Sequence, residues 1–273
     1  MAKVDNKNED IKSLMTDSGN SFHYRVVDFL REKGWTVEIS PYYSDNFTDK
    51  PREIDVIAEK EYEVCGHFGQ FQDVVGKISV QLFVECKYIT KNTIFWFDKK
   101  DIAKAIDRVI KDTPLRDPEK WSMIKEHRYL KDVQVAKLYS SNLTKNSDQQ
   151  ADDPIYKALS QSLNAMIYYK DSPPIIKQSP RYRGISSSLK YPVILCNNFD
   201  KFYKYDAVLK SDPELINDNF SLEINYAYLD KERKHEREYF LIDIVDFSKI
   251  EKLIDEIENN DIVAIKKKIY YGN

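Results

Sequence analysis

The segment VQLFVECKYI, residues 80–89, constrains the fold most, because this apolar run carries Glu85 and Lys87 two positions apart. Alternate side chains of a strand share a face, so Glu85 and Lys87 point the same way as Phe83. The opposite, core-facing set is Leu82, Val84, Cys86 and Tyr88. A strand at this place buries one face and presents a carboxylate beside an ammonium group on the other.

A second strand with a charged face precedes the first. Residues 52–64, REIDVIAEKEYEV, alternate apolar and polar side chains, with Asp55 on the face opposite the core. The core-facing residues are Ile54, Val56 and Ala58, and the opposite ones are Glu53, Asp55 and Ile57. The glycine-containing segment 66–77 predicts the distal end of a long hairpin that extends beyond the core as an arm. In this hairpin Asp55 adjoins Glu85 and Lys87.

Two carboxylates beside an ammonium group form a site for a hard divalent cation and a phosphate. Mg²⁺ takes few protein carboxylates, keeps several waters and leaves room for substrate oxygens. The plain alternative is a solvated sheet face, on which Lys87 forms a cross-strand ion pair with Glu85 or Asp55. Both interpretations are compatible with the spacing.

Strand and helix patterns alternate along the rest of the chain, which favours one α/β domain with a mixed sheet. Helical spacing is found at residues 18–34, 98–112, 153–170 and 249–259, the last with a capping-box pattern of Ser248 and Glu251. Strand patterns occur at 35–40, 133–141, 190–198, 221–229 and 237–245, and the tail 262–271 fits either state. Residues 1–17 are predicted to be a polar leader before a single domain over 18–273, with its core at about 18–170 and a C-terminal elaboration at about 171–273.

Composition excludes several classes of protein. The chain is 273 residues long, is 42% hydrophobic and has a net charge of -3, which argues against nucleic-acid binding through bulk charge. No apolar stretch reaches the length of a membrane span, so we expect a soluble, cytoplasmic protein without a membrane partner. The three cysteines lack CxxC spacing, and no nucleotide-binding glycine loop, GxSxG or HExxH motif is present.

The first predicted helix, IDVIA and VECKY together resemble the PD-(D/E)xK nuclease superfamily, which has the restriction-endonuclease-like fold. The resemblance covers residues 18–90 and, more loosely, the strand and helix at 133–169. It implies an αβββαβ core with a mixed central sheet, an extended hairpin and C-terminal strand and helix additions. It also implies that Asp55 and Glu85 bind the metal together with the backbone carbonyl of Cys86, and that Lys87 is the catalytic lysine.

The sequence departs from this family on the first helix, where many members carry a glutamate that faces the site. Here the matching position holds His23, which either ligates a metal or contacts phosphate, or is only a partly exposed helix residue. Glu53 lies on the same face as Asp55 and either supplies the missing carboxylate or is a solvated residue at the start of a strand.

The segment KQSPRYRGISSSLK, residues 177–190, is basic and contains no acidic residue. Basic and aromatic side chains with flexible glycine and serine suit phosphate contacts from a loop, although a soluble connector has the same composition. The candidate nucleic-acid-binding residues are Lys177, Arg181, Arg183 and Lys190.

We therefore expect a Mg²⁺-dependent nuclease, with Mn²⁺ able to substitute, that acts on nucleic acid and above all on DNA as an endonuclease. A role in defence against foreign DNA follows by analogy of fold alone. A homodimer would ease double-strand cuts, although the sequence does not specify one. The alternatives are a catalytically inactive nucleic-acid-binding or assembly module on the same fold, and an unrelated α/β interaction protein.

Overall fold

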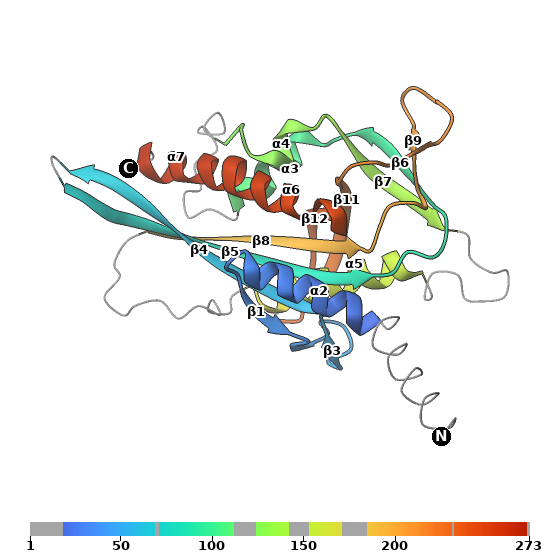
Figure 1. Ribbon diagram of the computed structural model, residues 1–273, viewed down its shortest axis with the longest axis horizontal. Helices are drawn as coiled ribbons and strands as arrows, with labels where there is room; N and C mark the ends of the chain where they lie inside the picture. The colour runs from blue at the N-terminus through green and yellow to red at the C-terminus, as the bar shows by residue number, and fades with distance from the viewer. Residues whose placement is uncertain are drawn as a thin grey trace, which may run out of the picture.

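A computed structural model describes residues 19–68, 71–111, 124–141, 153–170, 185–230 and 232–271. These residues form an α/β structure around a mixed sheet of ten strands, in the order β1-β4-β5-β8-β12-β11-β7-β6-β9-β10 (Figure 1). The sheet combines parallel and antiparallel neighbours, so the predicted α/β class with a mixed sheet is confirmed.

The N-terminal part of the sheet begins with helix α2 (Gly19–Glu32) and the antiparallel strands β1 (Thr36–Ile39), β4 (Val56–Phe68) and β5 (Phe71–Lys87). Strands β4 and β5 form the predicted long hairpin, in which Val56 pairs with Val84. The distal end of the hairpin projects beyond the helices as an arm (Figure 1). Strand β8 (Ile185–Cys196) then runs parallel to β5.

The other strands extend the sheet on the far side of β8. They are β6 (Thr93–Lys99), β7 (Gln134–Ser141), β9 (Phe202–Asp206), β10 (Glu214–Leu215), β11 (Phe220–Leu229) and β12 (His235–Asp246). Strand β7, which the resemblance loosely included in the core, pairs with β6 and β11 instead. One sheet thus contains strands from both the predicted core at 18–170 and the predicted C-terminal elaboration at 171–273.

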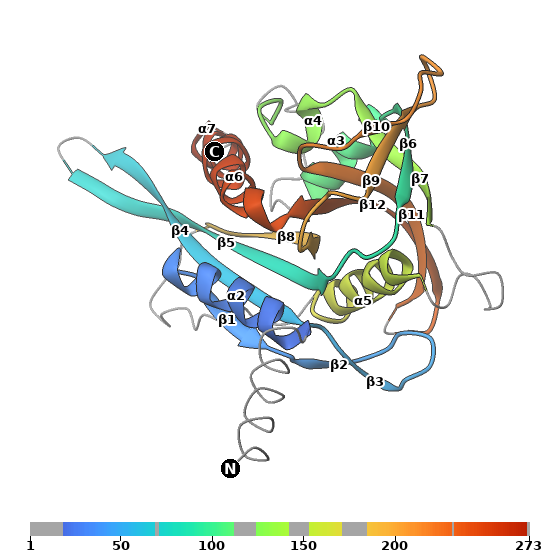
Figure 2. The same ribbon diagram turned by 45° about the vertical axis from the view of Figure 1, so that its right-hand side comes forward.

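Helices cover both faces of the sheet around β4, β5 and β8, so neither face there is the solvated one that the alternating pattern allowed. Helix α5 (Pro154–Tyr168) packs on the face of Ile57 and Phe83. The opposite face, which contains Val56 and Leu82, is covered by α2, α3 (Ile102–Lys111), α4 (Arg128–Lys131) and the C-terminal helices (Figure 2). Glu85, on the α5 face, is consequently enclosed.

The C-terminal segment is helical throughout and consists of η2 (Phe247–Lys249), α6 (Ile250–Glu256), the π-helical η3 (Ile257–Ile262) and α7 (Val263–Tyr271). The predicted helix at 249–259 is confirmed, but Ser248 does not cap it: Asp246 caps η2, which leads into α6, and α6 itself has no side-chain cap. The Asp246 carboxylate accepts the Ser248 N–H at 2.8 Å. No described helix is long and apolar enough to cross a membrane.

A bend interrupts the strand that was predicted over residues 52–64. Residues 51–53 form β3 (Pro51–Glu53), which pairs with β2 (Tyr42–Ser44) in a separate two-stranded sheet, whereas β4 begins at Val56. Ile54 therefore packs on the α5 face, not on the face of Val56 as the alternation predicted. Asp55 lies in the bend itself.

Candidate functional site

Glu85 and Lys87 lie at the end of β5, on the face that α5 covers. Glu85 is fully buried, and the side chain of Lys87 retains 20% exposure. The Lys87 Nζ donates a hydrogen bond of 2.8 Å to Glu85 Oε2. Only the lysine end of this ion pair opens to solvent.

Asp55 lies beside this pair, as the hairpin predicted. The backbone N–H of Asp55 is 3.3 Å from Glu85 Oε1, and the Cys86 N–H donates to Asp55 Oδ2 at 2.7 Å. Three side chains from the ends of two strands thus converge at one point, with Asp55 and Lys87 partly exposed. The bend at Asp55 takes its backbone out of the β4 ladder, so its N–H lies near Glu85 Oε1 while its carboxylate accepts the Cys86 N–H.

His23 fixes the bend from helix α2. Its Nε2 lies 2.7 Å from the backbone oxygen of Asp55, which can only accept, so Nε2 carries the proton. The Ser40 N–H donates to the same oxygen at 2.8 Å. Ser40 has a φ of 51°, a left-handed conformation that serine seldom adopts. His23 therefore contacts the site through the backbone of Asp55.

Burial sets the electrostatics of the site. Burial raises the pKa of Glu85 to about 8, and the neighbouring Asp55 carboxylate adds to the shift. Burial lowers the pKa of Lys87, but the Glu85 carboxylate outweighs it, and the net pKa is raised. Lys87 therefore stays charged, whereas Glu85 takes up a proton more readily than an exposed carboxylate does, and a divalent cation at the carboxylate pair would compete with that proton.

Two residues near the site were not expected from the sequence. Tyr43 is buried, and burial followed by the Glu85 carboxylate raises its pKa. Asn197, directly after β8, donates its N–H to the Lys87 backbone oxygen at 3.1 Å and accepts the Ile89 N–H at 2.7 Å. Both act across large sequence separations, so no local pattern identifies them.

Glu53 and Cys86 have different places in the site. Glu53 lies on β3, and its carboxylate raises the pKa of Tyr42 through a side-chain hydrogen bond. No hydrogen bond or ion pair within the described residues joins its carboxylate to Asp55, Glu85 or Lys87. Burial raises the pKa of the Cys86 thiol well above its usual value, so the thiol is neutral beside the two carboxylates.

The donor set fits a cation that takes few protein ligands. No group of three or more His, Cys, Asp and Glu side chains suited to a metal occurs in the described part of the chain. Asp55 and Glu85 provide a pair of carboxylates, and Asp55 Oδ1 accepts no hydrogen bond from a described residue. Mg²⁺ is commonly held by one or two carboxylates and completes its shell with water and substrate oxygens.

The basic segment is only partly described. Lys177, Arg181 and Arg183 lie outside the described residues. Lys190 lies in strand β8, as the strand pattern at 190–198 predicted, but it is buried and does not belong to an exposed phosphate-binding loop. Its Nζ donates to the backbone oxygens of Tyr169 and Lys170 at 2.7 and 2.6 Å. Lys190 therefore binds the carbonyl end of α5 rather than presenting its charge to a ligand.

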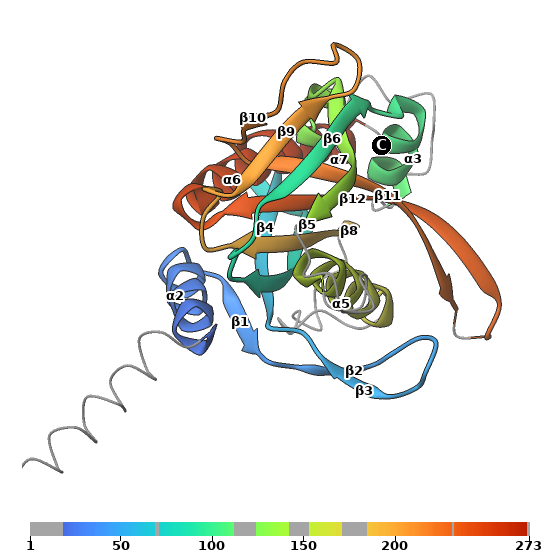
Figure 3. The same cartoon turned by 90° about the vertical axis from the view of Figure 1, so that its right-hand side faces the viewer.

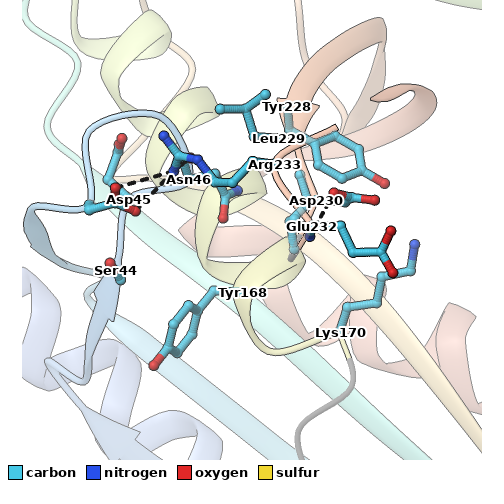
Figure 4. Close-up of a pocket in the computed structure, with 12 residues that line it drawn as sticks. Ser44, Asp45, Asn46, Tyr168, Lys170, Tyr228, Leu229, Asp230, Glu232 and Arg233 are labelled. Carbon is cyan, nitrogen blue, oxygen red and sulfur yellow. Dashed lines mark hydrogen bonds and ion pairs between the residues drawn. The ribbon is translucent and has the colours of Figure 1, made fainter. Parts of the chain in front are cut away.

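A cavity of about 640 Å³ is lined by neither Asp55 nor Glu85. It lies between the β2–β3 turn, the end of α5 and the β11–β12 turn (Figure 4). Arg233 crosses it and binds the Asp49 carboxylate at 3.1 Å and the Asn46 backbone oxygen at 3.2 Å. Asp45 and Asp230 accept backbone N–H groups of their own turns. Arg233 thus joins the two turns, while Asp45 and Asp230 each stabilise their own turn.

Comparisons with known proteins add no relative to this picture. No protein-family model, no curated protein and no solved structure matches the chain.

Proposed function

We propose that the protein is a Mg²⁺-dependent nuclease that hydrolyses phosphodiester bonds in DNA. The observation that carries this proposal is the convergence of Asp55, Glu85 and Lys87, with Glu85 fully buried and hydrogen-bonded to Lys87 Nζ at 2.8 Å. A buried carboxylate beside a second carboxylate is costly unless a cation compensates it. A structural ion pair alone would not need Asp55 at the same place.

The order of elements around the site supports the same proposal. If β2, β3, β6, α3, α4 and β7 are set aside as insertions, the remaining elements α2, β1, β4, β5, α5 and β8 follow one another in the αβββαβ order, with β8 parallel to β5 and in place of the strand at 133–141 that the resemblance covered. Asp55 precedes the second of these strands, and Glu85 and Lys87 end the third. The intervening strands β6 and β7 belong to the far part of the sheet.

Each residue has a distinct role in the proposed reaction. Asp55 and Glu85 would hold Mg²⁺, which supplies charge stabilisation at the phosphoryl oxygen and lowers the pKa of a water molecule. Lys87 would orient the attacking water and stabilise negative charge that develops in the transition state. His23 and the Cys86 N–H would keep the Asp55 bend in position.

The test is cleavage of circular DNA, linear DNA and single-stranded RNA in Mg²⁺, Mn²⁺ or EDTA. We expect metal-dependent cleavage of DNA by the wild type and a loss of at least about 100-fold in Asp55→Asn, Glu85→Gln and Lys87→Met. These substitutions preserve side-chain size, so circular dichroism should report an unchanged fold.

The ion pair between Lys77 and Glu61 provides a matched control, because it joins the same two strands away from the site. Glu61→Gln and Lys77→Met should retain cleavage. Full activity in the Asp55 and Glu85 variants would overturn the proposal. Binding of DNA without cleavage under any metal condition would instead support the inactive module, for which the engagement of His23 with a backbone oxygen is the favouring observation.

A further inference from the structure

Cationic side chains gather in a small cavity between α3 and β12. Its volume is about 190 Å³, and its charged walls are the cations Lys104, Arg108, Lys111 and Arg237 and the carboxylates Asp107 and Glu238. Figure 3 shows α3 beside β11 and β12 and well apart from α2, the helix that contacts the candidate site. The cavity is therefore a second place in the fold at which charged groups are brought together.

One face of α3 supplies three of these cations. Lys104, Arg108 and Lys111 follow one another at spacings of four and three residues, so they lie along one face of the helix. Arg108 is only 8% exposed, and its guanidinium lies 5.1 Å from the centre of the Phe240 ring. The Lys104 and Lys111 side chains are 49% and 52% exposed. Arg108 is thus fixed by packing, whereas the two lysines reach solvent.

A single carboxylate beside this face contacts three cations. Lys111 Nζ lies 2.8 Å and Arg108 Nη1 3.4 Å from Glu238 Oε1. From the end of α5, Lys170 Nζ lies 3.5 Å from Glu238 Oε2, which also accepts the Tyr228 hydroxyl at 2.8 Å. Burial raises the pKa of Glu238, but the hydrogen bond from Lys111 and the neighbouring positive charges outweigh it and lower the pKa overall. Glu238 therefore stays ionised, and three positive charges share its one negative charge.

Arg237 adds a cation that Glu238 does not contact. Its side chain is exposed at the wall of the cavity, and within the described part of the chain no hydrogen bond or ion pair involves its guanidinium. Lys104, by contrast, is paired with Asp101 at 3.0 Å. The other carboxylate of the cavity, Asp107, is exposed and forms no ion pair with a described cation. The described cations of the cavity thus outnumber its carboxylates, and the Arg237 guanidinium is available to a ligand.

A phosphate group matches this arrangement in both charge and hydrogen bonding. It carries up to two negative charges and offers three or more acceptor oxygens. A guanidinium binds two such oxygens at once, and an ammonium group binds phosphate as a point charge. Arg237 supplies the first kind of donor from β12, and Lys111 supplies the second from α3. A lone carboxylate ligand carries one charge and would compensate less of the surplus.

We propose that the cavity between α3 and β12 binds a phosphate group, which Arg237 and Lys111 contact directly. A free phosphate ion and a nucleic-acid strand both offer this group, and the measurements below distinguish them. The proposal does not depend on cleavage at Asp55 and Glu85, because neither residue lines the cavity. It gives the protein a ligand site besides the candidate metal site.

The test is isothermal titration calorimetry with inorganic phosphate at pH 8 and constant ionic strength. The protein is first freed of metal ions, so that Asp55 and Glu85 cannot hold the anion through a cation. Wild-type protein should bind one phosphate per chain. Arg237→Gln and Lys111→Gln should each weaken binding about 5-fold or more, because each removes a charged donor. Asp107→Asn should tighten binding about 3-fold, because it removes a negative charge that repels the anion.

Lys252→Gln is the matched control. Lys252 is nearly as exposed as Lys111, at 47% against 52%, and it pairs with Asp218 rather than with a residue of the cavity. Its variant should bind phosphate within about 2-fold of wild type. No binding by wild-type protein up to about 10 mM phosphate would overturn the proposal. Equal binding by wild type, Arg237→Gln and Lys111→Gln would overturn it too, as would weaker binding by Asp107→Asn.

Labelled oligonucleotides with and without a 5′-phosphate distinguish the sources of the group, by fluorescence anisotropy in the same buffer. Binding of both strands that weakens in Arg237→Gln assigns a backbone phosphate to the cavity. Binding that weakens only for the phosphorylated strand assigns a terminal phosphate. If neither strand depends on Arg237 while inorganic phosphate does, the cavity takes the free ion. All three outcomes support a phosphate site and differ only in the molecule that carries the phosphate.

Discussion

At the residue scale, Glu85 shows how far a local pattern can predict a site. The alternation in residues 80–89 predicted that Glu85 and Lys87 share a face, and their hydrogen bond confirms it. The pattern could not reveal that this face is also buried, because its cover comes from α5, far along the chain. The burial of the Glu85 carboxylate therefore depends on tertiary packing, not on the local sequence.

A buried carboxylate that faces another carboxylate should cost stability when no cation is present. We expect Glu85→Gln to raise the free energy of unfolding of the metal-free protein by about 1 to 2 kcal/mol at pH 8, since glutamine keeps the acceptor oxygen without the charge. Addition of Mg²⁺ should raise the Tm of the wild type but not that of the variant, because only the wild type gains binding energy from the ion. Differential scanning calorimetry measures both effects without any substrate.

Glu61→Gln serves as the control for this experiment, because Glu61 forms an ion pair with Lys77 on the same hairpin. Its Tm should respond to Mg²⁺ as the wild type does. A Mg²⁺ response that persists in Glu85→Gln would show that the ion binds elsewhere.

At the element scale, the hairpin was predictable and the bend before it was not. Regular alternation identifies β4 and β5, but it carried on through Ile54 and Asp55, where the chain actually leaves the strand. The bend is held by Ser40 in a left-handed conformation and by His23 from another element. Neither serine nor histidine is a typical signal for such a turn, so residue type gave no warning.

In the proposed reaction, the hydrogen bond from α2 to the bend makes His23 a positioning residue. We expect His23→Ala to lower kcat about 10-fold and to raise the Mg²⁺ concentration needed for half-maximal cleavage, because Asp55 loses one of two donors to its carbonyl oxygen. His23→Gln places an amide N–H near the Nε2 position and should restore activity to within about 3-fold of wild type. Steady-state kinetics at several Mg²⁺ concentrations distinguish the two variants. Equal losses in both would mean that the imidazole itself takes part.

At the scale of the whole molecule, the sheet depends on contacts that no local pattern contains. Strand β8 was predicted as a strand, but its place beside β5, which completes the wall of the site, follows from pairing across a long separation. Lys190 was misassigned for the same reason, since its partners are the carbonyl oxygens at the end of α5. The basic composition of a segment therefore predicts that its side chains are exposed only where no other part of the fold packs on them.

A buried polar network connects the distant parts of the fold. Arg128 of α4 donates to Asp261 Oδ2 of the π-helical segment at 2.8 Å and to Asp243 Oδ2 of β12 at 2.7 Å. Tyr191 of β8 donates to the same Asp261 oxygen at 2.9 Å. Because these groups are almost inaccessible to solvent, removal of one partner would leave an uncompensated buried charge.

His127 makes the stability of this network depend on pH. The imidazole is buried and caps α4, where Nδ1 accepts the Tyr129 N–H at 3.2 Å. Burial lowers its pKa to about 4, although the Asp261 carboxylate opposes the shift. The charged groups that face it are Asp261 from the π-helical segment, the adjacent Arg128, Lys100 and Arg108.

The sign of this contribution follows from proton binding. Between pH 6.5 and about 4 the unfolded chain binds a proton at His127 that the folded protein does not, so the free energy of unfolding falls as the pH is lowered through this range. The loss should amount to about 3 kcal/mol. In His127→Asn the side-chain oxygen can still accept the Tyr129 N–H, but the side chain does not titrate. The free energy of unfolding, measured with urea, should therefore fall less between pH 7 and pH 4 in the variant than in the wild type, by this amount. An equal fall in the two proteins would assign the acid sensitivity to other groups.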